Sequence, residues 1–136
     1  MIKKKNISCI IATHDRDEFL KGAIQSVLKQ TQPPLEIIVV NNIPNKQTQE
    51  IVRKIAETSQ VQINYLEHNM RGRGSISMNV AASKAKGEFI AFLNDDDLWE
   101  TDYLEKMIIL LKEKNSKINY SWSWKIKNNQ KTEHKK

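Results

Sequence analysis

The chain has 136 residues, a single cysteine and a formal net charge of +6 at neutral pH. That length fits one domain with its own hydrophobic core, and one cysteine excludes both a disulfide framework and a thiol-rich metal site. The apolar runs are too short to cross a bilayer and the N-terminus has no secretory-signal pattern, so we expect a cytoplasmic protein.

The elements are predicted from hydrophobic periodicity, which alternates between strand-like and helix-like segments. The predicted strands and helices, in chain order, are strand 7–13, helix 19–28, strand 35–40, helix 48–59, strand 61–66, helix 75–86, strand 88–93, helix 101–114 and strand 118–124. Residues 125–136 show no periodicity and are interpreted as a basic polar tail. Strands that alternate with helices predict an α/β fold, with a mostly parallel, Rossmann-like sheet and helices on both faces in a three-layer sandwich.

The positive charge is concentrated at the two ends of the chain. Residues 6–124 contain 14 basic and 15 acidic residues, so the body of the protein is almost neutral. A neutral body argues against a nucleic-acid partner. The basic ends are compatible with a peripheral contact with an anionic membrane surface, although solvated chain ends are the commoner case.

Three consecutive carboxylates, Asp95, Asp96 and Asp97, directly follow the apolar run 89–93. Like charges at this spacing disfavour one another's ionisation, so a cation would stabilise the cluster. Mg²⁺ and Mn²⁺ prefer oxygen ligands, and Mg²⁺ commonly takes one or two carboxylates together with the phosphates of a substrate. The alternative is an acidic turn in which Asp97 begins the next helix as its N-cap. Taken alone, the cluster leaves both interpretations open.

Polar residues also follow the first two predicted strands, at 12–15 and at 41–42. In open parallel sheets, ligands bind outside the carboxyl ends of the strands. The convergence of these segments with the acidic cluster therefore favours a metal-bridged nucleotide site over a helix cap. The loop 71–74 (RGRG) would reach the same edge, where a guanidinium suits a phosphate. The chain has neither a phosphate-binding P-loop nor a dinucleotide fingerprint in its first strand–helix turn.

Four segments resemble family 2 glycosyltransferases of the GT-A fold, in the order in which that family has them. They are 7–16 (ISCIIATHDR), 24–31 (IQSVLKQT), 36–42 (EIIVVNN) and 79–99 (NVAASKAKGEFIAFLNDDDLW). The resemblance runs from about Ile7 to Tyr120. It implies transfer of a sugar, usually with inversion, from a nucleotide-diphosphate donor (most often a UDP-sugar) to an acceptor that the sequence does not identify. It also implies Mg²⁺ or Mn²⁺ as cofactor and a role in cell-surface polysaccharide biosynthesis.

The resemblance implies roles for individual residues as well. The nucleotide-sugar-binding residues would be Ala12, Thr13, His14, Asn42, Arg73 and Asp95, and the metal ligand would be Asp96. The first three would border the base and the ribose, and Asn42 stands where the family often has an aspartate. Arg73 falls where some members place an arginine near the nucleotide, and Asp95 would approach the ribose or the donor sugar.

The general base of the family is a carboxylate in its second half, and Glu133 is the only acid after Trp124. We therefore expect residues 1–124 to be a truncated donor-binding domain with weak or absent transfer of its own, and no catalytic residue is assigned. The alternatives are a non-catalytic module that binds a nucleotide sugar, and a remnant that acts as an interaction or homodimerising protein through an exposed sheet edge.

Overall fold

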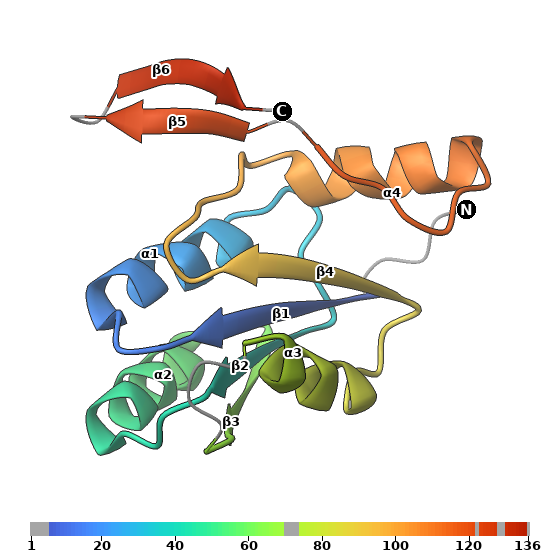
Figure 1. Ribbon diagram of the computed structural model, residues 1–136. Helices are drawn as coiled ribbons and strands as arrows, with labels where there is room; N and C mark the ends of the chain where they lie inside the picture. Colours follow the sequence, from blue (N-terminus) through green and yellow to red (C-terminus); the bar gives the residue numbers. More distant parts are fainter. Residues whose placement is uncertain (1–5, 70–73, 122, 128–129, 136) are drawn as a thin grey trace. The chain divides into compact units, whose positions relative to one another are not determined.

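The structure, a computed structural model, describes residues 6–69, 74–121, 123–127 and 130–135 (Figure 1). The chain forms two compact units, residues 1–105 and 106–136, which are described separately. Within the described residues, no helix is long and apolar enough to cross a membrane.

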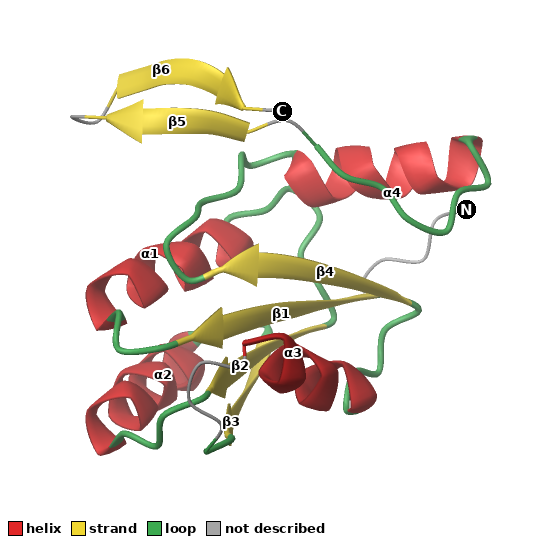
Figure 2. Cartoon of the chain, viewed as in Figure 1, coloured by secondary structure: helices red, strands yellow, loops and turns green. Residues whose placement is uncertain are grey.

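The first unit is built on a parallel four-stranded sheet with the strand order β3-β2-β1-β4. Its elements are β1 (Ile7–Thr13), α1 (Asp17–Leu28), β2 (Glu36–Asn41), α2 (Lys46–Thr58), β3 (Gln62–Glu67), α3 (Gly74–Ser83), β4 (Phe89–Asn94) and the start of α4 (Tyr103–Glu113). Helices α1 and α2 cover one face of the sheet and α3 covers the other (Figure 2). The predicted α/β fold with a parallel sheet between helices is confirmed.

The two central strands are apolar on both faces because helices cover both. Cys9 and Ile11 of β1 belong to the core beneath α1 and α2, whereas Ile10 belongs to the core beneath α3. This alternation follows the two-residue period of a strand. Burial of Cys9 raises the pKa of its thiol, which stays protonated and inert. On α1, the buried side chains recur at helical spacing, at Leu20, Ala23, Ile24 and Val27.

A buried carboxylate, Glu36, closes the amino-terminal edge of the sheet. It accepts hydrogen bonds from the Ser8 hydroxyl (2.7 Å), the Lys86 N–H (2.8 Å) and Asn64 Nδ2 (3.3 Å). The Gly87 N–H donates in turn to Ser8 Oγ (2.8 Å). A buried charge is tolerated when its oxygens are satisfied in this way. The network therefore fixes the start of β4 against β1 and β2.

The segment after β4 is tied to the end of α1 by a buried glutamine. Gln30 Nε2 donates to the Glu100 carbonyl (2.6 Å), and Gln30 Oε1 accepts from the Leu104 N–H (2.9 Å). Helix α4 consequently begins at Tyr103, six residues beyond Asp97. The interpretation of Asp97 as the N-cap of this helix is therefore wrong, because residues 98–102 separate the two without helical structure and the Gln30 side chain caps α4.

The second unit contains an antiparallel hairpin of β5 (Ser123–Lys127) and β6 (Gln130–Lys135). The predicted strand over 118–124 is wrong for its first four residues, 118–121, which have no regular structure, whereas Ser123 and Trp124 do begin β5. The tail expected without periodicity supplies the rest of β5 and all of β6. Ile118 and Tyr120, which belong to this predicted strand, are exposed. Backbone pairing needs no apolar pattern, which explains why the charged residues of these strands were not predicted to form a hairpin.

Candidate functional site

The carboxyl ends of β1, β2 and β4 meet at one edge of the sheet. In the register, Thr13 lies beside Asn41 of β2, and Ala12 lies between Val40 and Asn94. The chain leaves β1 toward β2 on one side and reaches β4 on the other side through α3. The gap between β1 and β4 is thus the topological switch point, where open α/β sheets bind their ligands.

Asp95 is locked against the end of β1. Only 6% exposed, it accepts from the Thr13 hydroxyl (2.9 Å) and the His14 N–H (3.3 Å) through Oδ2. Its other oxygen lies 3.5 Å from Arg16 Nη1. Because both oxygens are engaged, this carboxylate serves to hold the turn after β4 against the loop after β1.

Asp96 points toward solvent and is held by Arg16. Arg16 Nη1 donates to Asp96 Oδ2 at 2.9 Å, and both side chains are about half-exposed, at 52% and 45%. Asp15, in the left-handed region with φ 54°, turns the chain so that Arg16 becomes the N-cap residue of α1 and faces the acidic turn. Arg16 received no role from the sequence, although a cation two residues after His14 on the same edge as three aspartates was a usable signal.

Two of the predicted nucleotide-binding residues face each other. His14 Nδ1 lies 2.7 Å from Asn42 Oδ1, and because a carbonyl oxygen only accepts, Nδ1 carries the proton in this contact. Asn42 is buried and its N–H donates to the Thr13 carbonyl (3.3 Å). The neighbouring Asn41 is turned away from the site, since its Nδ2 donates to the Tyr65 hydroxyl (3.0 Å).

The remaining predicted residues divide into three cases. The Ala12 side chain packs with the core beneath α3, so only its backbone faces the strand ends. Arg73 lies outside the described residues. Asp97 closes the turn after β4, where its N–H donates to the Asn94 carbonyl (3.2 Å) and its Oδ2 accepts from Asn94 Nδ2 (3.3 Å).

The donor set at this edge fits a hard divalent cation that is shared with a ligand. No group of three or more His, Cys, Asp or Glu side chains that could hold a metal ion by itself occurs in the part of the chain that the structure describes. Mg²⁺, however, typically needs only one or two carboxylates when substrate phosphates complete its shell. Asp96 is accessible and is already paired with a cation, the Arg16 guanidinium. On that observation the residues fit the metal.

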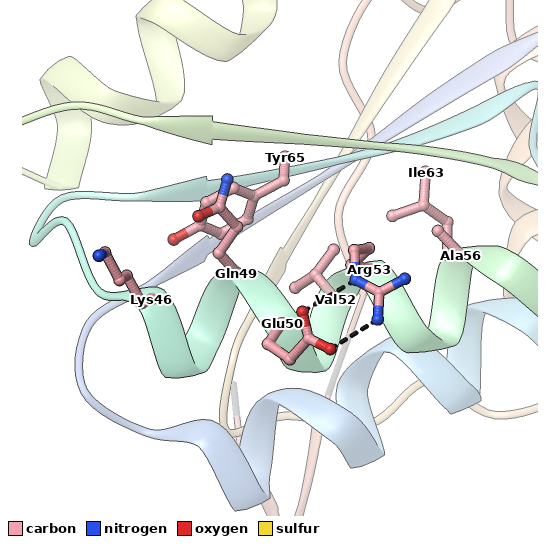
Figure 3. A pocket seen from close by; sticks show the side chains of 8 residues that line it. All are labelled: Lys46, Gln49, Glu50, Val52, Arg53, Ala56, Ile63 and Tyr65. Carbon is pink, nitrogen blue, oxygen red and sulfur yellow. Dashed lines mark hydrogen bonds and ion pairs between the residues drawn. The ribbon is translucent and has the colours of Figure 1, made fainter.

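A groove of about 560 Å³ lies elsewhere, between α2 and the edge strand β3 (Figure 3). Arg53 on its wall is ion-paired with Glu50 and also with Glu57, and Lys46 lines the groove as well. Burial raises the pKa of Tyr65, on the groove wall, to about 12. A neutral phenol and an ion-paired arginine indicate no particular reaction, so we assign the groove no chemistry.

The comparison with protein families identifies the chain. The family described as Glycosyl transferase family 2 matches residues 8–136. The chain belongs to this family. The family predicted from the sequence motifs is thereby confirmed, whereas the roles of individual residues stay predictions.

Two curated relatives of this family 2 chain are glycosyltransferases of bacteria. A putative teichuronic acid biosynthesis glycosyltransferase, TuaG of Bacillus subtilis, is 27% identical over 87% of this chain and 46% of its own length. The Escherichia coli protein WfgD, a UDP-Glc:alpha-D-GlcNAc-diphosphoundecaprenol beta-1,3-glucosyltransferase, is 30% identical over 90% of this chain and 47% of its own length. The chain thus spans less than half the length of these relatives.

Solved structures agree with the fold. A mannosyltransferase from Pyrobaculum calidifontis, in complex with GDP-Man and Mn²⁺, superposes with a TM-score of 0.73 over 80% of this chain and 33% of that one. At 24% identity it shows the fold alone. Residues 1–349 of S. aureus TarS, in complex with UDP-GlcNAc, are 28% identical and superpose with a TM-score of 0.65 over 79% of this chain and 31% of that one.

Proposed function

We propose that this chain is the donor-binding part of a glycosyltransferase and holds a nucleotide-diphosphate sugar at the carboxyl ends of β1, β2 and β4. The observation that supports this proposal most is that the two adjacent aspartates of the acidic turn have different surroundings. Asp95 is buried and fixed by two donors from the end of β1, and Asp96 is thereby presented to solvent at the switch point.

In this proposal Asp96 would hold Mg²⁺ or Mn²⁺, and Asp95 would position Asp96. When bound, the metal supplies positive charge that stabilises the leaving diphosphate. The acceptor hydroxyl attacks the anomeric carbon as the bond to the diphosphate breaks, and family resemblance makes inversion the expected outcome. No residue of this chain is assigned as the base that takes the hydroxyl proton.

The base and ribose lie, in this proposal, against the ends of β1 and β2. His14 and Asn42 present a ring edge and an amide there, and their mutual hydrogen bond is replaceable by bonds to a pyrimidine. A UDP-sugar is the proposed donor. WfgD is named for UDP-Glc and a TarS structure contains UDP-GlcNAc, which supports this choice. The acceptor class is that of a surface polysaccharide, as the name of TuaG suggests.

The proposal is tested by calorimetric titration of the chain with UDP. The titration is carried out once in the presence of Mn²⁺ and once in the presence of EDTA. We expect UDP to bind at least about ten-fold more tightly with Mn²⁺, and we expect Asp96→Ala to abolish this gain. The reason is that loss of a metal ligand should lower metal affinity at least as much as loss of a residue that only supports a ligand. Asp97→Ala, which removes the adjacent carboxylate, is the matched control and should retain the gain. UDP binding that ignores Mn²⁺, or an Asp96→Ala variant equal to the parent chain, contradicts the proposal.

A further inference from the structure

The cation that faces the acidic turn in this structure belongs to the protein itself. Arg16 Nη1 contacts both neighbouring carboxylates, Asp96 Oδ2 at 2.9 Å and Asp95 Oδ1 at 3.5 Å. One positive charge between two carboxylates reduces their mutual repulsion. The guanidinium therefore occupies the electrostatic position that the proposed function gives to a divalent metal.

The two carboxylates depend on Arg16 to different degrees. Asp95 also receives the Thr13 hydroxyl and the His14 N–H, so it stays fixed when the guanidinium leaves. Asp96 is held by a half-exposed ion pair, and pairs of this kind contribute little free energy because both groups are well solvated when apart. The bond from Arg16 to Asp96 is consequently the one that a stronger cation displaces.

The backbone keeps Arg16 close after such a displacement. The left-handed turn at Asp15 and the start of α1 at Asp17 fix the position of its Cα. Only the flexible side chain has to move, and Arg16 makes no side-chain capping bond that would be lost. The arrangement allows the guanidinium to leave and return without any change in the fold.

We propose that Arg16 is an internal counter-cation that neutralises Asp96 in the donor-free protein and competes with the divalent metal for it. This inference rests on the proposed function, in which Asp96 is the metal ligand. Its consequence is that Mn²⁺ alone binds less tightly than it would without the guanidinium, and that the phosphates of the nucleotide favour the exchange.

The test is a titration of the chain with Mn²⁺ in the absence of nucleotide. The electron paramagnetic resonance signal of free Mn²⁺ measures how much of the metal is bound. We expect Arg16→Gln to bind Mn²⁺ about three-fold more tightly than the parent chain, because the competing half-exposed pair is gone. Arg53→Gln is the matched control: Arg53 is equally exposed and also pairs with two carboxylates, but on α2. It should leave Mn²⁺ binding unchanged. Arg16→Lys keeps a point charge and should fall between the parent chain and Arg16→Gln.

The outcomes separate this inference from the proposed function. The proposed competition is overturned if Arg16→Gln binds Mn²⁺ no more tightly than the parent chain does. Circular dichroism verifies that each variant is folded. Mn²⁺-dependent UDP binding that persists in the parent chain and disappears in Asp96→Ala leaves the proposed function intact in that case. If neither Mn²⁺-dependent UDP binding nor tighter Mn²⁺ binding by Arg16→Gln is observed, both the metal site and the competition are refuted.

Discussion

Replacing Thr13 by valine tests whether a single hydroxyl holds the two halves of the site together. Thr13 is 3% exposed and its hydroxyl donates to Asp95 Oδ2 at 2.9 Å. Valine has nearly the same shape but no donor, so this buried oxygen keeps only the His14 N–H at 3.3 Å. A hydrogen bond to a charged group is worth about 1.5–3 kcal/mol. We expect the free energy of unfolding to fall by about 2 kcal/mol.

Urea unfolding followed by circular dichroism measures this loss, and Thr13→Ser is the control. Serine keeps the hydroxyl and loses one buried methyl group, which costs about 1 kcal/mol. The expected order of stability is therefore the parent chain, then Thr13→Ser, then Thr13→Val. At this chain length, a loss of about 2 kcal/mol also lowers the Tm by about 6 °C.

A double-mutant cycle with Asp95→Asn isolates the hydrogen bond from other effects of the substitutions. Because the two side chains are in direct contact, we expect a coupling energy of about 1–2 kcal/mol between Thr13→Val and Asp95→Asn. A coupling near zero, or a Thr13→Val variant as stable as Thr13→Ser, would refute the view that this bond fastens the turn after β4 to β1.

Three further predictions concern positions away from the acidic turn. Gly87→Ala should lower the free energy of unfolding by about 1–3 kcal/mol in the same urea assay, since the added Cβ would lie 2.6 Å from the Ser8 backbone nitrogen. An unchanged urea midpoint would contradict this close approach. Cys9, fully buried with a raised thiol pKa, should react with a disulfide reagent only after unfolding, so stoichiometric labelling of the native chain speaks against the packing described. Tyr65 has a pKa of about 12, raised mainly by burial, so the folded state keeps the proton that the unfolded state loses near pH 10. The parent chain should therefore lose stability relative to Tyr65→Phe as pH rises from about 10 to 12, and parallel pH profiles of the two proteins would exclude this burial.

The sheet was predictable because its strands are buried on both faces. The predicted and observed ends of β1 coincide, and those of β2 differ by one residue, since short segments rich in β-branched residues strongly favour strands. Helix α2 begins two residues earlier than predicted because Asn45 caps it, with its side chain accepting from the Gln47 N–H. Capping by a side chain leaves a weaker trace in the sequence than a hydrophobic stripe does, so helix starts were less accurate than strands.

The site was predictable only where strand geometry determines it. Parallel strand ends bring Thr13, His14 and Asn42 to the edge that Asp95 occupies, and this convergence follows from topology. The Arg16 contact depends on the left-handed conformation of Asp15, which no apolar period reveals. The cap assigned to Asp97 was wrong for a similar reason, since the first turn of α4 is capped by the distant Gln30 side chain, which follows α1.

Two buried carboxylates lie at opposite edges of the same sheet, and their surroundings differ in one respect that bears on the proposed site. Glu36 accepts from a hydroxyl, a backbone N–H and an amide, and all of these donors are fixed by packing. Asp95 has a comparable set, but the residue after it, Asp96, is held by one flexible and half-exposed guanidinium. A ligand can replace a solvated side chain at small cost, whereas replacing a buried donor would leave a charge unsatisfied. The carboxylate whose partner is easily replaced, Asp96, therefore lies at the edge where we propose that the ligand binds.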